Sequence, residues 1–194
     1  MSLTPKTTLH LWLCFSSIRD GQHIAYNQEY EGNLDVCIIH TDGPPINLTG
    51  GPGAEGSPSW SPDGTRIAFS SDRHGTLDMC VLHLDSGTVD RLTTGASADI
   101  GPAWSPDARR IAFSSDGDGD HEIYLMNADG TGLVRLTDNL VDDVDPSWSP
   151  DGRYLSFTND PPQNADIYII SIEGVLLPPL IDHPALDFGA SWGR

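Results

Sequence analysis

Residues 101–116 read GPAWSPDARRIAFSSD, and two similar segments occur in the same chain of 194 residues: SPSWSPDGTRIAFSSD at 57–72 and DPSWSPDGRYLSFTND at 145–160. They align without a gap, so that Trp60, Trp104 and Trp148 lie 44 residues apart, and Trp192 continues the series. A fixed period of this length is typical of solenoids and propellers. The sequence therefore predicts one domain with repeats at about 9–56, 57–100, 101–144 and 145–187, and a closing strand at 188–194.

Each repeat is predicted to form four short strands, because polar and apolar residues alternate between turn signals and no segment has a helical period. In the Ser-Pro-Asp-Gly motif the proline presets φ and the glycine takes a positive φ, which predicts a tight hairpin. Ala108 replaces this glycine in the third repeat and predicts a relaxed turn there. Four strands per repeat describe a propeller blade, with the tryptophans as wedges between blades. In the first repeat only Phe15 is available for the tryptophan position.

Further motifs follow the same period, among them His121–Asn127, Ala128-Asp129-Gly130 and Arg135-Leu136-Thr137. With the tryptophan segments, they resemble the PD40, or TolB-like, propeller repeats over roughly residues 20–192. The resemblance implies an all-β propeller of four-stranded antiparallel blades. Propellers of this type usually have more than four blades. The alternatives are therefore a small ring closed by the last strand, a homodimer that completes the ring, or a piece of a longer protein.

The charge is strongly unbalanced, with 28 acidic residues against 10 basic ones and a net charge of −18 at pH 7. Such a chain repels nucleic acid, and no apolar run is long enough for membrane insertion. The segment Leu9–Phe15 is read as a strand rather than as part of a signal peptide. The family resemblance implies a periplasmic or extracellular location, whereas a start at Met1 without a signal peptide would leave the protein in the cytoplasm.

In a propeller, the loops between the second and third strands and the loops between blades emerge on one face. Acidic residues that have no role in turns gather in these loops, so we place the binding surface there and expect a protein or peptide partner with basic segments. The predicted binding residues are Asp72, His74, Asp99, Asp116, Asp118, Asp120, His121, Asp142, Asp143 and Asp145.

No cofactor is required by the sequence, but Ca²⁺ is one alternative. Asp116, Asp118, Asp120 and Glu122 alternate with glycines and a histidine, as hard oxygen ligands would, although only the first half of an EF-hand pattern is present. A metal-dependent propeller enzyme using His74 and His121 is a second alternative, and the propeller module of a prolyl-oligopeptidase-type hydrolase is a third. Gly189–Gly193 matches G-x-S-x-G but lacks the context of a nucleophile elbow. We therefore predict a non-catalytic scaffold.

One acidic position recurs in every repeat, at Asp35, Asp78, Glu122 and Asp166. The simpler interpretation is a structural acceptor for loop amides. The alternative is a ring of carboxylates that lines the mouth of the channel and selects cations or basic peptides.

Overall fold

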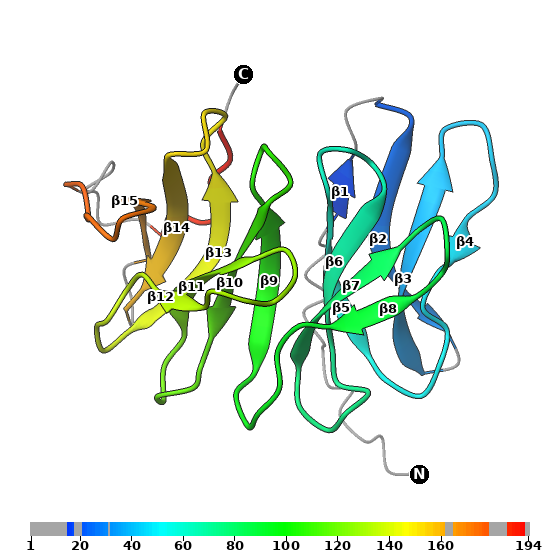
Figure 1. Ribbon diagram of the computed structural model, residues 1–194, viewed down its shortest axis with the longest axis horizontal. Coiled ribbons are helices and arrows are strands. Elements are labelled where there is room, and N and C mark those ends of the chain that lie inside the picture. Colours follow the sequence, from blue (N-terminus) through cyan, green and yellow to red (C-terminus); the bar gives the residue numbers. More distant parts are fainter. Residues whose placement is uncertain (1–14, 18–20, 31, 162–164, 179–185, 193–194) are drawn as a thin grey trace, which may run out of the picture.

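The computed structural model describes residues 15–17, 21–30, 32–161, 165–178 and 186–192. These residues form antiparallel sheets that follow one another in chain order across the molecule (Figure 1). The all-β propeller architecture is confirmed. None of the described residues builds a helix with the length and apolar character needed to cross a membrane.

Each sheet is one blade. Blade 1 contains β1 (Phe15–Ser17), β2 (His23–Tyr30), β3 (Asn33–His40) and β4 (Ile46–Asn47). Blade 2 contains β5 (Glu55–Trp60), β6 (Arg66–Ser71), β7 (Asp78–His83) and β8 (Val89–Arg91). Blade 3 contains β9 (Asp99–Trp104), β10 (Arg110–Ser115), β11 (Glu122–Asn127) and β12 (Val134–Arg135). Blade 4 contains β13 (Asp142–Trp148), β14 (Tyr154–Asp160) and β15 (Asp166–Ser171).

The innermost strands β5, β9 and β13 share a bulge three residues before their tryptophans. Ser57, Gly101 and Asp145 occupy this position with φ of 52°, 63° and 56°, and the pairing register shifts there. A bulge bends and twists a strand locally, so one strand can serve two differently oriented neighbours. The period of 44 residues thus extends to the backbone conformation.

The Ser-Pro-Asp-Gly hairpin, with Ala108 in place of the glycine in blade 3, repeats with the same hydrogen bonds in blades 2, 3 and 4. Ser61 Oγ donates to Asp63 Oδ1 at 2.6 Å and accepts the Arg66 amide at 3.0 Å. Blade 3 keeps this geometry although Ala108 replaces glycine, since its φ is 58°, close to the 73° of Gly64. The predicted relaxed turn is therefore wrong. The Arg66 guanidinium from the preceding blade donates to the Ala108 carbonyl at 3.1 Å and helps to hold the turn.

The strained alanine gives a direct stability prediction. Replacing Ala108 with glycine should raise the free energy of unfolding by about 1 kcal/mol, because a Cβ at positive φ is unfavourable. Urea denaturation followed by tryptophan fluorescence measures the change. Gly64→Ala is the matched control and should lower stability by a similar amount; a destabilised Ala108→Gly variant would contradict the strain argument.

The hydrophobic core lies between the blades rather than within one sheet. At the boundary of blades 3 and 4, for example, Ala112, Ile123 and Leu125 pack against Trp148 and its neighbours. The indoles of the last three tryptophans also donate to the carbonyl one residue before the preceding tryptophan: Trp104 to Ser59 at 3.1 Å, and Trp148 to Ala103 and Trp192 to Ser147 at 3.0 Å each. The interpretation of these tryptophans as wedges between blades is confirmed.

The two ends of the repeat series differ from expectation. In blade 1, Ser17 pairs with Ile24 as Trp60 pairs with Ile67, so Ser17 and not Phe15 stands at the tryptophan position. Residues 9–14 lie outside the described residues. Residues 186–192 are not part of a sheet, since no described segment supplies their partner strand. They dock on blade 4 through the Trp192 indole and the bond from the Asp187 amide to the Ala165 carbonyl.

Candidate functional site

The loops between second and third strands pack against the segments that connect blades. Asp72 Oδ1 accepts the Ala54 amide at 2.7 Å, and Asp116 Oδ1 accepts the Ala98 amide at 2.6 Å. Both kinds of loop therefore emerge on the same side, as predicted; we call this side the loop face. Asp72 and Asp116 hold its backbone together, and each has its second oxygen left for a partner.

Other ionisable residues of the loop face are either paired with a side chain of this protein or at least partly exposed to solvent. Asp118 and Asp138 both form ion pairs with Arg135. Asp142 Oδ1 accepts the His121 amide at 2.8 Å and lies 3.3 Å from its ring nitrogen. His74 and Asp145 are exposed, and Asp120 is half-buried.

Three of the four carboxylates predicted as calcium ligands have different partners among the described residues, and no donor among those residues reaches Asp120 Oδ2. Asp116 caps a loop, Asp118 pairs with Arg135, and Glu122 is buried, where its Oε1 accepts the Asn139 amide at 2.6 Å. Within the described ranges, no group of three or more histidine, cysteine, aspartate or glutamate side chains is placed to hold a metal ion. Calcium binding stays a prediction, and this geometry provides no ready ligand set for it.

At each boundary between successive blades, a buried acid lies on either side. One lies at or near the start of the third strand of a blade, and the other lies at or near the start of the innermost strand of the next, five residues before its tryptophan. The pairs are Asp35 with Glu55, Asp78 with Asp99, and Glu122 with Asp143. Asp99 and Asp143, predicted as surface residues, are therefore buried beneath the loops. The recurring acids at the third strands are buried too, so the alternative of a carboxylate ring lining the channel mouth is wrong.

At each of the first two boundaries, an arginine of the chain pairs with one of the two buried acids. At the boundary of blades 1 and 2, the Arg73 guanidinium lies 2.9 Å from Glu55, and Asn47 Nδ2 donates to Asp35 at 2.7 Å. At the boundary of blades 2 and 3, the Arg91 guanidinium lies 2.8 Å from Asp78. Buried carboxylates require such partners, because desolvation penalises an uncompensated charge.

Among the described residues, no arginine pairs with the acids at the boundary of blades 3 and 4. Arg135 opposes Tyr124 as Arg91 opposes Cys80, but its guanidinium turns outward to Asp118 and Asp138. Asp143 accepts hydrogen bonds from Asn139 Nδ2 and Asn159 Nδ2, each at 2.6 Å. No donor faces the buried Glu122 Oε2, whose carboxyl group is in hydrogen-bond contact with Asp143.

Contact between two carboxyl groups is favourable only when they share a proton. Burial raises the pKa of Glu122, and the neighbouring Asp143 carboxylate raises it further. Burial raises the pKa of Asp143 as well, against the hydrogen bonds from Asn159 and Asn139. The pair therefore retains a proton to higher pH than isolated carboxyl groups would.

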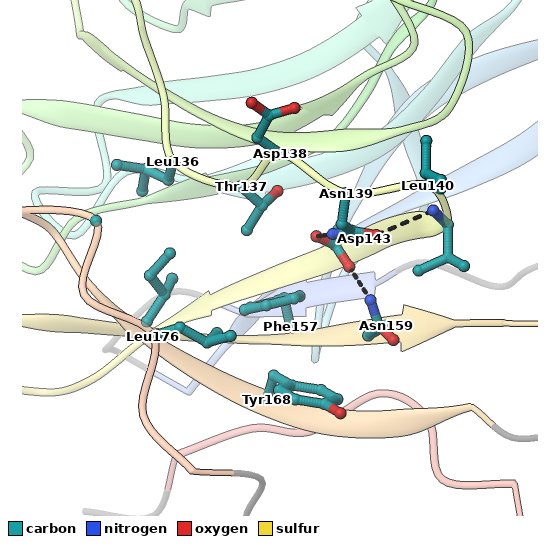
Figure 2. A pocket seen from close by; sticks show the side chains of 13 residues that line it. Leu136, Thr137, Asp138, Asn139, Leu140, Asp143, Phe157, Asn159, Tyr168 and Leu176 are labelled. Carbon is teal, nitrogen blue, oxygen red and sulfur yellow. Dashed lines mark hydrogen bonds between the residues drawn. The ribbon is translucent and has the colours of Figure 1, made fainter.

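A pocket of about 590 Å³ is lined in part by Asp143, whereas Glu122 lies behind it and does not line the pocket. Figure 2 shows Asp143 between Asn139 and Asn159, with Phe157 and Tyr168 along one wall. The two aromatic rings stack with centroids 6.0 Å apart, and Leu140 at the rim is 94% exposed. The equivalent pocket between blades 2 and 3, which is lined by Asp99, Phe113 and Tyr124, has about 310 Å³.

This architecture can be compared with known proteins. Residues 95–180 match the family model described as PD40, the TolB β-propeller domain. Over these residues, which span the strands of blades 3 and 4, the chain is similar to the PD40 repeats of the TolB β-propeller. No curated protein matches it.

Solved structures extend the likeness of this PD40 propeller beyond the matched residues. A protein assigned as TolB from Agrobacterium tumefaciens is 28% identical, with a TM-score of 0.75 over 84% of this chain and 62% of the other. TolB from Acinetobacter baumannii is 24% identical, with a TM-score of 0.74 over 86% of this chain and 43% of that one. A puromycin-hydrolyzing peptidase from Mycobacterium tuberculosis is 17% identical, with a TM-score of 0.69 over 91% of this chain and 29% of the peptidase. The chain thus spans less than two thirds of each.

Several residues of the PD40 propeller site were not predicted. The sequence did not identify Glu55 as a buried acid, and it did not identify the pocket residues Asn139, Asn159 and Tyr168. One sequence signal was available, because Glu55, Asp99, Asp143 and Asp187 all lie five residues before a tryptophan of the series. The pairing of this position with the acid of the preceding blade is visible only in the folded chain.

The proton-sharing pair predicts an unusual pH dependence. A carboxyl group whose folded pKa lies above its ordinary 4.5 stabilises the fold below that pH and loses this contribution as the pH rises through the folded pKa. Glu122→Gln keeps a donor toward Asp143 without the titration. It should match the wild type near pH 4 and exceed its stability by about 1 kcal/mol at pH 8, as measured by urea denaturation across this range. A parallel pH profile for both proteins would contradict the shared proton.

Proposed function

We propose that this PD40 propeller is a non-catalytic scaffold that binds a protein or peptide with a basic segment through its loop face. The observation that carries the proposal is an imbalance of charge. The loop-face arginines Arg73, Arg91 and Arg135 already pair with acids of the chain. The surrounding acids exceed them, and a basic partner would supply the missing positive charge.

The loop-face carboxylates differ in how far they are open to a partner. The side chains of Asp138, Asp142 and Asp118 are 79%, 51% and 43% exposed. With a net charge of −18, the whole chain attracts cationic partners, and the loops direct that attraction to one face. Exposed acids of this kind contribute to association rate and selectivity more than to raw affinity.

Fluorescence anisotropy with a labelled peptide of alternating arginine and serine tests the proposal, with a glutamate-serine peptide as the negative probe. Binding should weaken steeply as salt increases. The triple variant Asp118→Asn, Asp138→Asn, Asp142→Asn should weaken binding about tenfold.

The matched control removes the same charge from the opposite face through Asp42→Asn, Asp85→Asn and Glu173→Gln. This variant should retain most of the affinity. If both triple variants lose affinity equally, net charge alone would explain binding, and the assignment to the loop face would be wrong.

The likeness to TolB supports a role through protein contacts, and the same resemblance supports a periplasmic or extracellular location. A second candidate is the docking or gating module of a hydrolase. The observation that favours it is the likeness in fold to the Mycobacterium tuberculosis peptidase, of which this chain covers 29%. Stable association with a separately produced hydrolase domain in sizing chromatography would support that candidate, whereas peptide binding by the propeller alone supports the first.

A further inference from the structure

We propose that the pocket between blades 3 and 4 binds a guanidinium group of the partner, which there takes the place that an arginine of the chain takes at the other boundaries. The inference rests on the proposed binding of a basic segment and names the group that is recognised. The chemical class of the ligand is an arginine side chain next to an apolar residue.

The first step is the comparison of equivalent positions. Asn47, Arg91 and Arg135 occupy the same register in the outermost strands of blades 1, 2 and 3. Asn47 donates to Asp35, and Arg91 pairs with Asp78, but Arg135 leaves Glu122 and turns to the surface. Position 73, where Arg73 of blade 2 pairs with Glu55 at the start of the same blade, corresponds to Pro161 in blade 4. Both sources of an internal guanidinium are therefore absent at this boundary.

The second step is the unmet acceptor. Glu122 is 1% exposed, and apart from the contact with Asp143 no donor among the described residues serves its Oε2. Asp143, which is in contact with it, is fully buried yet forms part of the pocket wall. Nearby charged groups do not compensate, since Arg135 pairs with Asp118 and Asp138, and the His121 ring lies against Asp142. A cation entering this pocket would meet a surplus of negative charge from carboxyl groups that are themselves buried.

The third step is the shape of the pocket. Asn159 covers Asp143 from the pocket side, and its half-buried side chain must turn for a donor to reach the carboxylate (Figure 2). Tyr168 offers a ring on which a planar guanidinium stacks favourably. Leu140 and Leu176 at the pocket provide contact for an apolar neighbour of the arginine. A guanidinium fits this combination better than an ammonium, because it stacks and donates in a fixed plane.

Binding of a guanidinium changes the protonation of Glu122 and Asp143. In the free protein, burial and mutual contact raise the pKa of Glu122 and burial raises that of Asp143, which favours a proton held between them. A guanidinium remains charged throughout, so its arrival favours loss of that proton to the buffer and leaves two carboxylates around one cation. The step breaks the shared O–H bond, forms N–H···O hydrogen bonds and involves no oxidation.

The test is isothermal titration calorimetry of the intact chain with N-acetyl-arginine amide, in two buffers of different ionisation enthalpy. We expect saturable binding with release of up to about one proton per ligand, and an affinity that rises with pH. N-acetyl-citrulline amide, which has the same shape without charge, should not bind. Glu122→Gln, which is expected to fold well, should abolish proton release and weaken binding about tenfold. Glu29→Gln, an exposed acid of blade 1, is the control and should change neither.

Failure of the inference is distinguishable from failure of the proposed function. If the arginine-serine peptide binds but the arginine amide does not saturate, or binds Glu122→Gln unchanged, the pocket assignment is overturned while the loop-face scaffold stands. If the arginine amide binds with proton release but the peptide does not depend on the loop-face acids, the pocket stands and the proposed function is overturned.

Discussion

Replacing Trp104 with alanine is expected to lower the free energy of unfolding by about 3–5 kcal/mol, the largest effect of any single change considered for this propeller. The indole is only 6% exposed and packs at the boundary of blades 2 and 3 with Ala68, Ile111 and Phe113. Its removal leaves a cavity between the two sheets, and it also removes the donor to the Ser59 carbonyl. Urea denaturation followed by circular dichroism measures the loss.

Trp104→Phe separates packing from hydrogen bonding. It keeps an aromatic ring in the wedge but cannot donate to Ser59, so it should cost clearly less than the alanine variant. The Arg66 guanidinium, 4.4 Å from the ring centroid, retains a cation–π partner in this control. If the alanine variant unfolds with nearly wild-type stability, the blades are held together by something other than the tryptophan series.

Replacing Arg73 with alanine is expected to destabilise the protein by about 2–3 kcal/mol at pH 7, because it leaves the buried Glu55 charge without its counterion. The Glu55 side chain is fully buried, while Arg73 keeps a partly exposed guanidinium 2.9 Å away. Ser71 Oγ is a weaker partner at 3.1 Å and cannot replace a positive charge. Thermal and urea denaturation at several pH values measure the effect.

The pH dependence of this variant has a defined sign. Burial already raises the pKa of Glu55, and Arg73 partly offsets that rise. Without Arg73 the folded pKa rises further, so stability is retained below the ordinary 4.5 and lost as the pH increases through the new value. The destabilisation should therefore shrink in acid. The double variant Arg73→Ala, Glu55→Gln should recover most of the stability at pH 7; equal losses in single and double variants would rule out the uncompensated charge.

Much of the fold was predictable because it depends on local motifs and on the period at which they recur. The spacing of Trp60, Trp104 and Trp148 defined the blades, and the Ser-Pro-Asp-Gly motif defined the hairpins. The exceptions arose where tertiary contacts overruled local preference. Ala108 keeps the strained turn because the neighbouring blade holds its carbonyl through Arg66. Ser17 takes the tryptophan position because strand pairing, rather than residue type, sets the register.

The candidate site was predictable only in part. The acidic loops and their common face followed from repeat topology, but the sequence could not distinguish exposed Asp142 from buried Asp143 next to it. Adjacent residues of a strand point to opposite sides, and which side is covered depends on the blade that packs there.

By itself, the sequence determined the repeat, the all-β propeller, the wedge residues and the excess of acid on one face, since these follow from period, turn chemistry and composition. Only the tertiary structure decided which acids meet. Glu122 and Asp143 begin strands of different blades, and their contact exists because two sheets pack together there. Arg135 turns outward to Asp118 and Asp138, so Glu122 lacks a counterion, and burial with the neighbouring Asp143 raises its pKa. Which carboxylate an arginine pairs with depends on distances that only the folded chain defines.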